Sequence, residues 1–218
     1  MFSSCSVCIG ALPGLGSVGK VAADYLTTAL ECEPVKSFFS KGFPAQIMVS
    51  DGLAYLLQAE LKAPKDREGL LIFSGDAQPL EIREMYLLAG EVLEEARSRG
   101  STDFIALAAY VGEAENKVLG AASDSDAARQ LEAAGLPLLR SGAIGGLNGL
   151  LAGLAPLYGM RGFCLLGTTT GEEPVDLRAT RNLLQILLPL LDLDITLEDL
   201  PFEELEEAVQ EEPDMNYR

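Results

Sequence analysis

The residues that follow the first apolar run of the chain have the spacing of a phosphate-binding loop. Residues 14–19 read G-x-G-x-x-G between a predicted strand and a predicted helix, the context that a dinucleotide site requires. Glu31 or Glu33 could bind the ribose, but neither ends a clear second strand. The same run reads G-x-x-x-x-G-K, yet Val21 stands where a nucleotide phosphate loop needs Ser or Thr for magnesium. Glycines also occur where a strand turns sharply into a close-packed helix, and the sequence favours this packing interpretation.

Three further glycine-containing loops are predicted to follow apolar runs, at residues 75–79, 142–149 and 167–171. Because the carboxyl ends of parallel strands share one sheet edge, and ligands bind there, we expect the four loops to converge on a crevice. The residues predicted to line it are Gly14, Gly16, Gly19, Asp76, Gln78, Asn148, Thr168 and Thr169. In the loop of residues 142–149, close backbone approach is the simpler explanation of the glycines, and free amides for an anion are the alternative.

Side chains that could carry out catalysis are few. The chain has no histidine, which excludes Ser-His and Cys-His nucleophile systems and most zinc sites. A carboxylate pair such as Asp76 with Glu113 could perform acid–base chemistry, although solvated loop acids are the more common explanation. Cys5 and Cys8 form a C-x-x-C, but in a predicted strand they point to opposite faces. We therefore predict no catalytic residue, no metal and no cofactor.

Apolar runs that alternate with helical patterns must position these loops. The strands are predicted at residues 7–12, 35–39, 46–50, 70–74, 104–110 and 162–166. The helices are predicted from about residue 17, from about residue 80 to Gly100, and at 124–134, 147–157 and 175–188, with a last one from about 197. Near-continuous apolar strands that alternate with helices indicate an α/β fold with a mostly parallel sheet covered on both faces.

Composition predicts one globular domain. Of the 218 residues, 48% are hydrophobic and 22% are charged, as in an ordinary globular fold. We expect a single α/β domain over residues 1–195, followed at 196–218 by an amphipathic helix and an acidic tail. The uncharged run at residues 141–160 contains six glycines and is predicted to form a turn and a buried helix rather than a membrane span. The cysteines are predicted to be reduced thiols, which indicates a cytoplasmic protein.

Charge excludes two classes of partner. The formal net charge is −17, and residues 190–218 hold eleven acids against one base, Arg218. Such a surface repels the phosphates of nucleic acid and an anionic membrane, so we expect neither as a partner. The acidic end is interpreted as a solubilising segment, or alternatively as a segment that meets a basic partner.

Several segments together resemble the family of archaeal and eukaryotic proteasome assembly chaperones. They run in the family's order and cover roughly residues 5–190. These segments are Leu12–Gly19, Phe43–Gln46, Ser74–Pro79, Gly145–Leu151 and Cys164–Gly167.

The resemblance implies a three-layer αβα fold similar to nucleoside phosphorylases and certain peptidases. It also implies a non-enzymatic role, in which the protein binds proteasome α-subunits, helps them form their ring and forms homo-oligomers. Several members end in a hydrophobic-Tyr-any tail that inserts between neighbouring α-subunits. Here Tyr217 and Arg218 fill the last two positions, whereas Asn216 departs from the pattern, which asks for an apolar side chain.

The sequence therefore leaves three functions open. The leading hypothesis is an assembly chaperone or adaptor that binds proteasome α-subunits through the tail Asn216-Tyr217-Arg218. The alternative is a small-molecule enzyme of phosphorylase or hydrolase type that uses the predicted crevice. The third is an oligomeric scaffold with an unrelated partner, in which the final helix packs between subunits.

Overall fold

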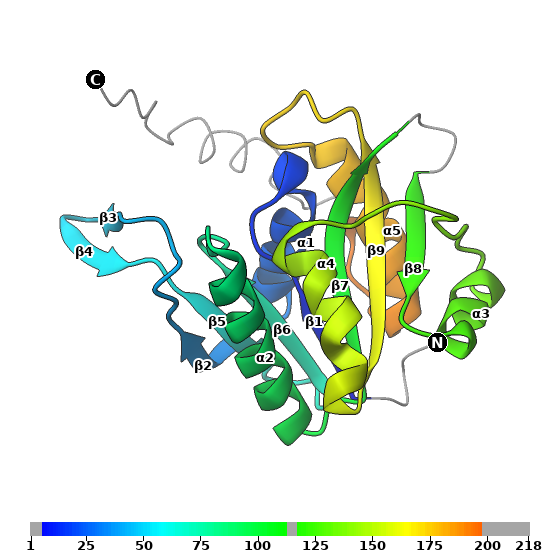
Figure 1. Ribbon diagram of the computed structural model, residues 1–218, viewed down its shortest axis with the longest axis horizontal. Helices are drawn as coiled ribbons and strands as arrows, with labels where there is room; N and C mark the ends of the chain where they lie inside the picture. Colours follow the sequence, from blue (N-terminus) through cyan, green and yellow to red (C-terminus); the bar gives the residue numbers. More distant parts are fainter. Residues whose placement is uncertain (1–5, 113–116, 198–218) are drawn as a thin grey trace.

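The computed structural model describes residues 6–112 and 117–197, and in this part of the chain a seven-stranded sheet lies between helices (Figure 1). The sheet strands are β1 (Val7–Gly10), β2 (Glu33–Phe38), β5 (Ala59–Ala63), β6 (Leu70–Gly75), β7 (Asp103–Val111), β8 (Val118–Ala122) and β9 (Arg161–Thr169). The helices are η1 (Leu15–Ser17), α1 (Val18–Ala29), α2 (Ile82–Ser98), α3 (Ser125–Ala133), α4 (Gly146–Leu154), η2 (Ala155–Tyr158) and α5 (Leu177–Leu191). The predicted α/β class is confirmed.

The sheet is mixed. Its order is β2-β5-β6-β1-β7-β9-β8, and the four central strands β6, β1, β7 and β9 are paired in parallel. At the edges, β5 pairs antiparallel with β6, β2 with β5, and β8 with β9. The prediction of a mostly parallel sheet is therefore correct for the central strands and wrong at the edges, where the pairing is antiparallel. The edges were not predicted because neither β5 nor β8 was predicted as a strand. The similarity of the fold to nucleoside phosphorylases, which the family resemblance implies, stays a prediction.

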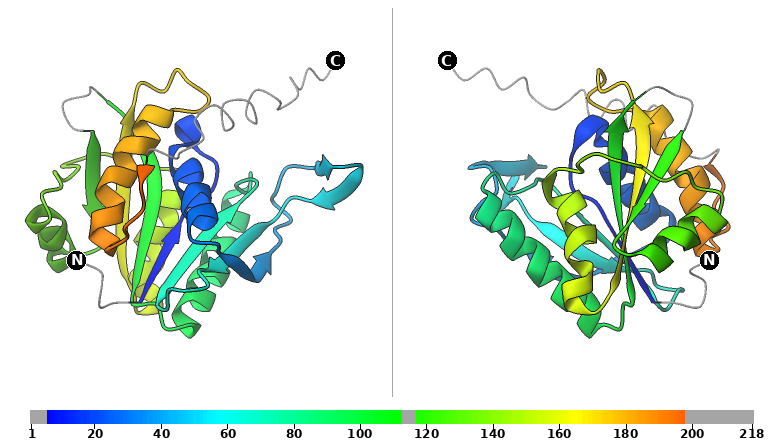
Figure 2. Two further views of the ribbon diagram at one scale, coloured as in Figure 1. Left: turned by 180° about the vertical axis from the view of Figure 1, so that it is seen from behind. Right: turned by 45° about the vertical axis from the view of Figure 1, so that its right-hand side comes forward.

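Alternate side chains of the central strands form two cores. On one face, Ile9 and Ile72 pack with α1 and α5, and both side chains are fully buried. On the other face, Phe73 and Phe104 pack with α2 and α4. Figure 2 shows these helix pairs on opposite sides of the sheet. Strands with both faces covered read as continuous apolar runs, which is why the sequence predicted them.

A two-stranded hairpin projects from this body (Figures 1 and 2). It consists of β3 (Ile47–Ser50) and β4 (Leu53–Leu56), paired antiparallel with Ile47 opposite Leu56. Asp51 and Gly52 join the strands with φ values of 51° and 77°, as a tight two-residue hairpin turn requires. We call residues 47–56 the arm.

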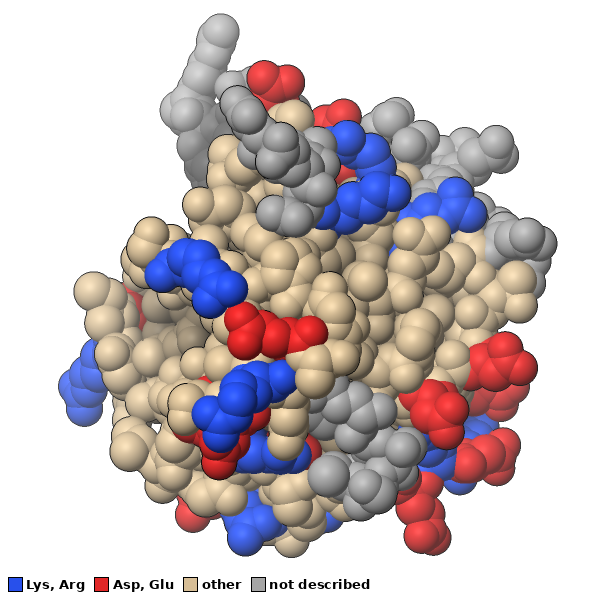
Figure 3. Space-filling model, turned by 90° about the vertical axis from the view of Figure 1, so that its right-hand side faces the viewer, with Lys and Arg blue, Asp and Glu red and all other residues tan. Residues whose placement is uncertain are grey.

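The face shown in Figure 3 has no continuous basic patch, and the uncharged run at residues 141–160 contains a short helix. On the face shown in Figure 3, basic side chains are interspersed with acidic ones rather than gathered into one continuous patch. Within the described residues, no helix has both the length and the apolar character needed to cross a membrane. The run at 141–160 forms a loop, α4 and η2, so the predicted turn and helix are confirmed there.

Several predictions fall on residues outside the described part of the chain. They concern Cys5, Glu113, the helix expected from about residue 197, and the tail Asn216-Tyr217-Arg218. The boundary between residues 195 and 196 likewise stays a prediction.

Candidate functional site

Three of the four predicted loops meet at the carboxyl edge of the central strands. They enclose a cavity of about 220 Å³ that is lined by Gly14, Gly19, Gln78 and Asn148, together with Tyr110 and other neighbours. These four residues were predicted to share a crevice, and they come from the loop after β1, the start of α1, the loop after β6 and the first turn of α4.

The side chain of Asn148 is committed to the backbone beside the cavity. Its Oδ1 accepts a hydrogen bond from the Leu12 N–H at 2.8 Å, and its Nδ2 donates to the Leu12 carbonyl at 2.9 Å. Asn148 is only 5% exposed, so both bonds are buried. Its amide therefore fastens Leu12, in the segment after β1, to α4.

Gln78 fastens the same loops from the other side. Its Nε2 donates to the Pro13 carbonyl at 2.6 Å, and its Oε1 accepts from the Leu147 N–H at 2.7 Å. The second bond satisfies a backbone donor in the first turn of α4, a group without a partner inside the helix. Gln78 thus bridges the loop after β1 and the start of α4.

The glycines of the first loop permit close packing. A Cβ added at Gly19 would lie 2.2 Å from the Leu107 carbonyl oxygen of β7, so a larger residue would push α1 off the sheet. Gly16 has φ 56°, and its carbonyl accepts from the Asp176 N–H at 2.9 Å. The close approach at Gly19 supports helix–sheet packing, the interpretation that the sequence favoured, and the positive φ of Gly16 fits its turn.

Other predicted crevice residues lie elsewhere. The Asp76 carboxylate accepts from the Gln58 N–H at 2.9 Å and thereby joins the ends of β5 and β6. Thr168 is buried within β9, opposite Tyr110 of β7. The prediction of a loop at residues 167–171 is therefore wrong at its beginning, because β9 continues to Thr169. Gly16 is buried, does not line the cavity and faces Asp176.

The described cysteines are poor nucleophiles. Cys8 and Cys164 are buried in β1 and β9, and burial raises the pKa of Cys8 far above its ordinary value and that of Cys164 to about 12. Burial also raises the pKa of Cys32 to about 11. Thiols with such pKa values stay protonated at neutral pH. Within residues 6–112 and 117–197, no three metal-ligating side chains form a cluster.

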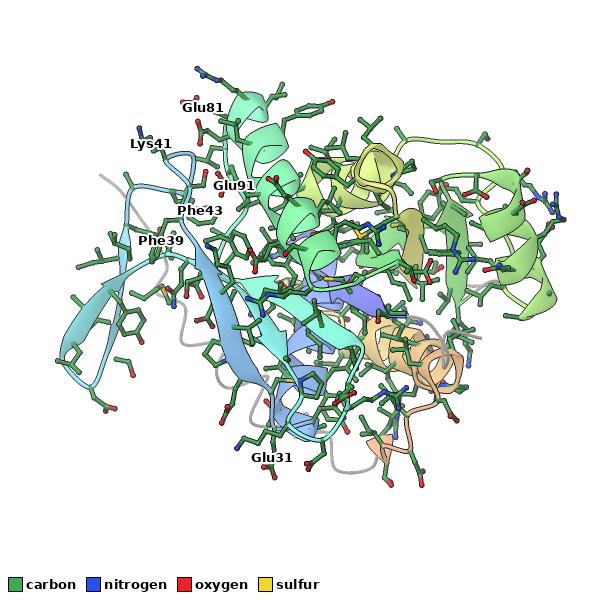
Figure 4. The ribbon with its side chains drawn as sticks, turned by 90° about the horizontal axis from the view of Figure 1, so that it is seen from below. Glu31, Phe39, Lys41, Phe43, Glu81 and Glu91 are labelled. Carbon is green, nitrogen blue, oxygen red and sulfur yellow. The ribbon has the colours of Figure 1, made fainter. Side chains whose placement is uncertain are left out.

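The arm forms a second candidate region. A strand was predicted at residues 46–50, but the hairpin that β3 and β4 form was not. All eight residues of β3 and β4 are exposed, although most are apolar. A groove of about 430 Å³ at its base is lined by Phe39, Phe43, Ile47 and Leu56, among others. Figure 4 shows Phe39 and Phe43 between the arm and α2. The signal that could have revealed the hairpin is Asp51-Gly52 between two apolar runs.

Comparison with known proteins assigns the family. A family model described as the PAC2 family matches residues 8–212, which is nearly the whole chain. The chain belongs to the PAC2 family. The resemblance inferred from the ordered sequence segments is thereby confirmed.

Other PAC2-like proteins are similar over most of their length. An uncharacterized protein of Methanocaldococcus jannaschii is 31% identical over 198 residues, which cover 88% of this chain and 76% of that protein. The crystal structure of Pyrococcus furiosus PbaB, an archaeal proteasome activator, has a TM-score of 0.80 and 28% identity, and the match covers 94% of this chain and 91% of PbaB. Pyrococcus furiosus PbaA, an archaeal homolog of proteasome-assembly chaperone, has a TM-score of 0.77 and 25% identity, with 94% and 88% covered.

Proposed function

We propose that this protein is a non-enzymatic assembly chaperone or adaptor that binds proteasome α-subunits, with the tail Asn216-Tyr217-Arg218 as one of its contacts. The observation that carries the proposal is the match to an archaeal proteasome activator over 94% of the chain at a TM-score of 0.80. Membership of the PAC2 family and similarity to PbaA support the same direction.

The state of the carboxyl-edge cavity supports a binding role over catalysis. The polar atoms of Gln78 and Asn148 are hydrogen-bonded to the backbone of neighbouring loops. These hydrogen bonds hold α4 to the first loop, so both amides have a structural role. Such groups position a fold well and make poor acids, bases or nucleophiles.

The charge of the chain favours a basic docking surface on the partner. Eleven acids lie in residues 190–218, against Arg218 alone. Opposite charge on the partner accelerates encounter, and the effect weakens as salt screens it. The ring of Tyr217 would enter an apolar pocket on the partner.

Native mass spectrometry with separately expressed proteasome α-subunits tests this proposal. We expect the full-length chain to bind and a chain that lacks residues 216–218 to bind at least about tenfold more weakly, since the loss of one buried aromatic anchor alone costs more than about 1.4 kcal/mol. Tyr217→Ala should reproduce most of that loss. Asn216→Leu should bind about threefold to tenfold more tightly, because it buries apolar surface where the tail now places an amide.

The measurement tests the tail contact and α-subunit binding separately. Unchanged binding after truncation would remove the tail from the interface and assign binding to the folded domain. Absence of binding by the full-length chain would contradict the proposed function for those α-subunits.

A further inference from the structure

The chain leaves the folded body at a defined place beside α1. The hydroxyl of Tyr25 on α1 donates a hydrogen bond to the Thr196 carbonyl at 3.0 Å. The side chain of Leu197 packs against the core that α1 and α5 share with the sheet. Leu197 is the last described residue, and residues 198–218 follow it in the sequence. The tail is therefore tethered to the α1 side of the body.

The cavity at the carboxyl edge lies within reach of that tether. Gly19, in the first turn of α1, lines the cavity and precedes Tyr25 by six positions, which is a rise of roughly 9 Å along the helix axis. Leu197 and Tyr217 are 20 positions apart, and a flexible chain of this length has an r.m.s. end-to-end distance of roughly 25 Å. The end of the chain can thus reach the cavity without any rearrangement of the fold.

The cavity suits a single apolar side chain. Its volume of about 220 Å³ is below the range of roughly 300–1,000 Å³ that is typical of small-molecule pockets. None of the described residues that line it carries a charge, and its two amides, those of Gln78 and Asn148, are hydrogen-bonded to the backbone. The walls that remain include Leu12, Ile144 and the ring of Tyr110, and a second aromatic ring packs well against such groups.

Two aromatic side chains follow Leu197 in the sequence, Phe202 and Tyr217. Two glutamates come directly after Phe202, so the entry of its ring would bring carboxylates to an uncharged cavity where they lose water without gaining a partner. The side chains on either side of Tyr217 are not acidic. The chemistry of the cavity therefore favours Tyr217.

The charge of α5 favours the same route for the tail. The Thr180 hydroxyl donates to the Val18 carbonyl at 3.4 Å, so the first turns of α5 and α1 lie side by side (Figure 2). Helix α5 carries two exposed arginines, Arg178 and Arg181, and no acid. Residues 198–214 contain nine acids. Attraction between these charges draws the tail toward the first turn of α1, which borders the cavity.

We propose that the carboxyl-edge cavity is a binding site for the protein's own residues 216–218, with the ring of Tyr217 against Tyr110. A short flexible tether gives the tail an effective concentration in the millimolar range, so even a weak contact is populated. A docked tail is unavailable to an α-subunit, so its release from the cavity regulates the proposed contact. That consequence rests on the proposed function, whereas the docking itself does not.

Hydrogen–deuterium exchange of the chain alone tests the docking. The backbone amides of residues 12–19 and 141–149 border the cavity. They should exchange about threefold to tenfold faster in a chain without residues 216–218, and in Tyr217→Ala, because the docked tail no longer protects them. Phe202→Ala is the matched control and should exchange like the full chain. Tenfold dilution should leave the protection unchanged, because tail and cavity belong to one chain.

A substitution on the cavity side provides a second test with the tail intact. Leu15 lines the cavity and is 43% exposed, so Leu15→Glu places an acid at the border of the cavity and should speed exchange as truncation does. Leu157→Glu adds the same charge on η2, at the far end of α4, and should change nothing. Circular dichroism should show native folding in both variants, because neither side chain is buried.

Equal exchange in the full and truncated chains would overturn the proposal. Protection that is lost in Phe202→Ala and kept in Tyr217→Ala would also overturn it, because a different segment would then fill the cavity. Protection that disappears on dilution would assign the tail to a second copy of the chain and contradict docking within one chain.

The regulatory consequence has its own measurement. Leu15→Glu should bind α-subunits about threefold to tenfold more tightly than the unmodified chain, because a larger fraction of its tails is free. Unchanged affinity of this variant would contradict the regulatory step. Protection by the tail in a chain that binds no α-subunit would contradict the proposed function and support the assignment of the cavity.

Discussion

Strands β1 and β6 and the arm strands β3 and β4 are built from the same kinds of side chain, but they differ in what surrounds them. Ile9 and Ile72 are fully buried between helices, whereas Ile47 of the arm is 56% exposed. The apolar side chains of these body strands are therefore buried within one chain, whereas those of the arm are exposed. This difference indicates that the hydrophobicity of the body specifies the fold, whereas that of the arm specifies a contact with another molecule.

The same contrast holds for polar groups. In the body, Gln78 and Asn148 use their amides to fasten loops, so the cavity between them is part of the architecture. In the arm, the outer edges of the strands keep their backbone groups available to another chain. A substitution in the body should consequently affect stability, and one at an exposed arm side chain should leave stability nearly unchanged.

The largest expected effect is at Gly19, where α1 packs tightly against β7. Gly19→Ala places a methyl group against the Leu107 carbonyl, and should lower the free energy of unfolding by about 3 kcal/mol. Urea denaturation followed by circular dichroism measures this. The matched control is Gly153→Ala on α4, where a Cβ meets nothing within 4 Å. There the higher helix propensity of alanine should stabilise the protein by about 0.5–1 kcal/mol. Equal effects at the two glycines would contradict the packing account of the G-x-G-x-x-G run.

An intermediate effect is expected at the cavity. Asn148→Ala leaves the buried N–H and C=O of Leu12 without their side-chain partner, and should destabilise the protein by about 2 kcal/mol in the same measurement. Asn182→Ala, at a half-buried position of α5, is the control and should change stability by less than about 0.5 kcal/mol. If Asn148→Ala kept full stability, the amide would be free for a ligand, and a structural role for it would be ruled out.

The smallest effect on stability is expected in the arm. Val49→Glu/Leu53→Glu should change the free energy of unfolding by less than about 0.5 kcal/mol, because neither side chain is buried. Urea denaturation of the dilute protein measures this. A loss comparable with that of Asn148→Ala would show that the arm packs on its own body, and would remove the contrast between the two regions.

Much of the body could be predicted from the sequence. The central strands are buried on both faces, so they read as apolar runs, and five of the predicted helices are present with ends shifted by a few residues. Strands β5 and β8 escaped prediction because Glu60 and Lys62 interrupt the first and small residues dominate the second. Their strand character comes from pairing with β6 and β9, which is tertiary information.

The position of the cavity could be predicted from the sequence, but the hydrogen-bond partners of its amides could not. Parallel topology brings Gly14, Gly19, Gln78 and Asn148 to one edge of the sheet, as the sequence indicated. Whether an amide faces a ligand or the backbone depends on contacts between residues such as Leu12 and Asn148, which lie 136 positions apart. The turn of the arm, in contrast, carried a local signal in Asp51-Gly52 that was overlooked.

The most direct test of the account is one set of native mass spectra of proteasome α-subunits mixed with three forms of the protein: the full chain, a chain without residues 216–218, and Val49→Glu/Leu53→Glu. The account predicts that the truncated chain binds α-subunits at least about tenfold more weakly than the full chain. It also predicts that the arm variant, whose tail is unchanged, still binds α-subunits. Undiminished binding by the truncated chain, or loss of α-subunits by the arm variant, would contradict the assignment of α-subunit binding to the tail.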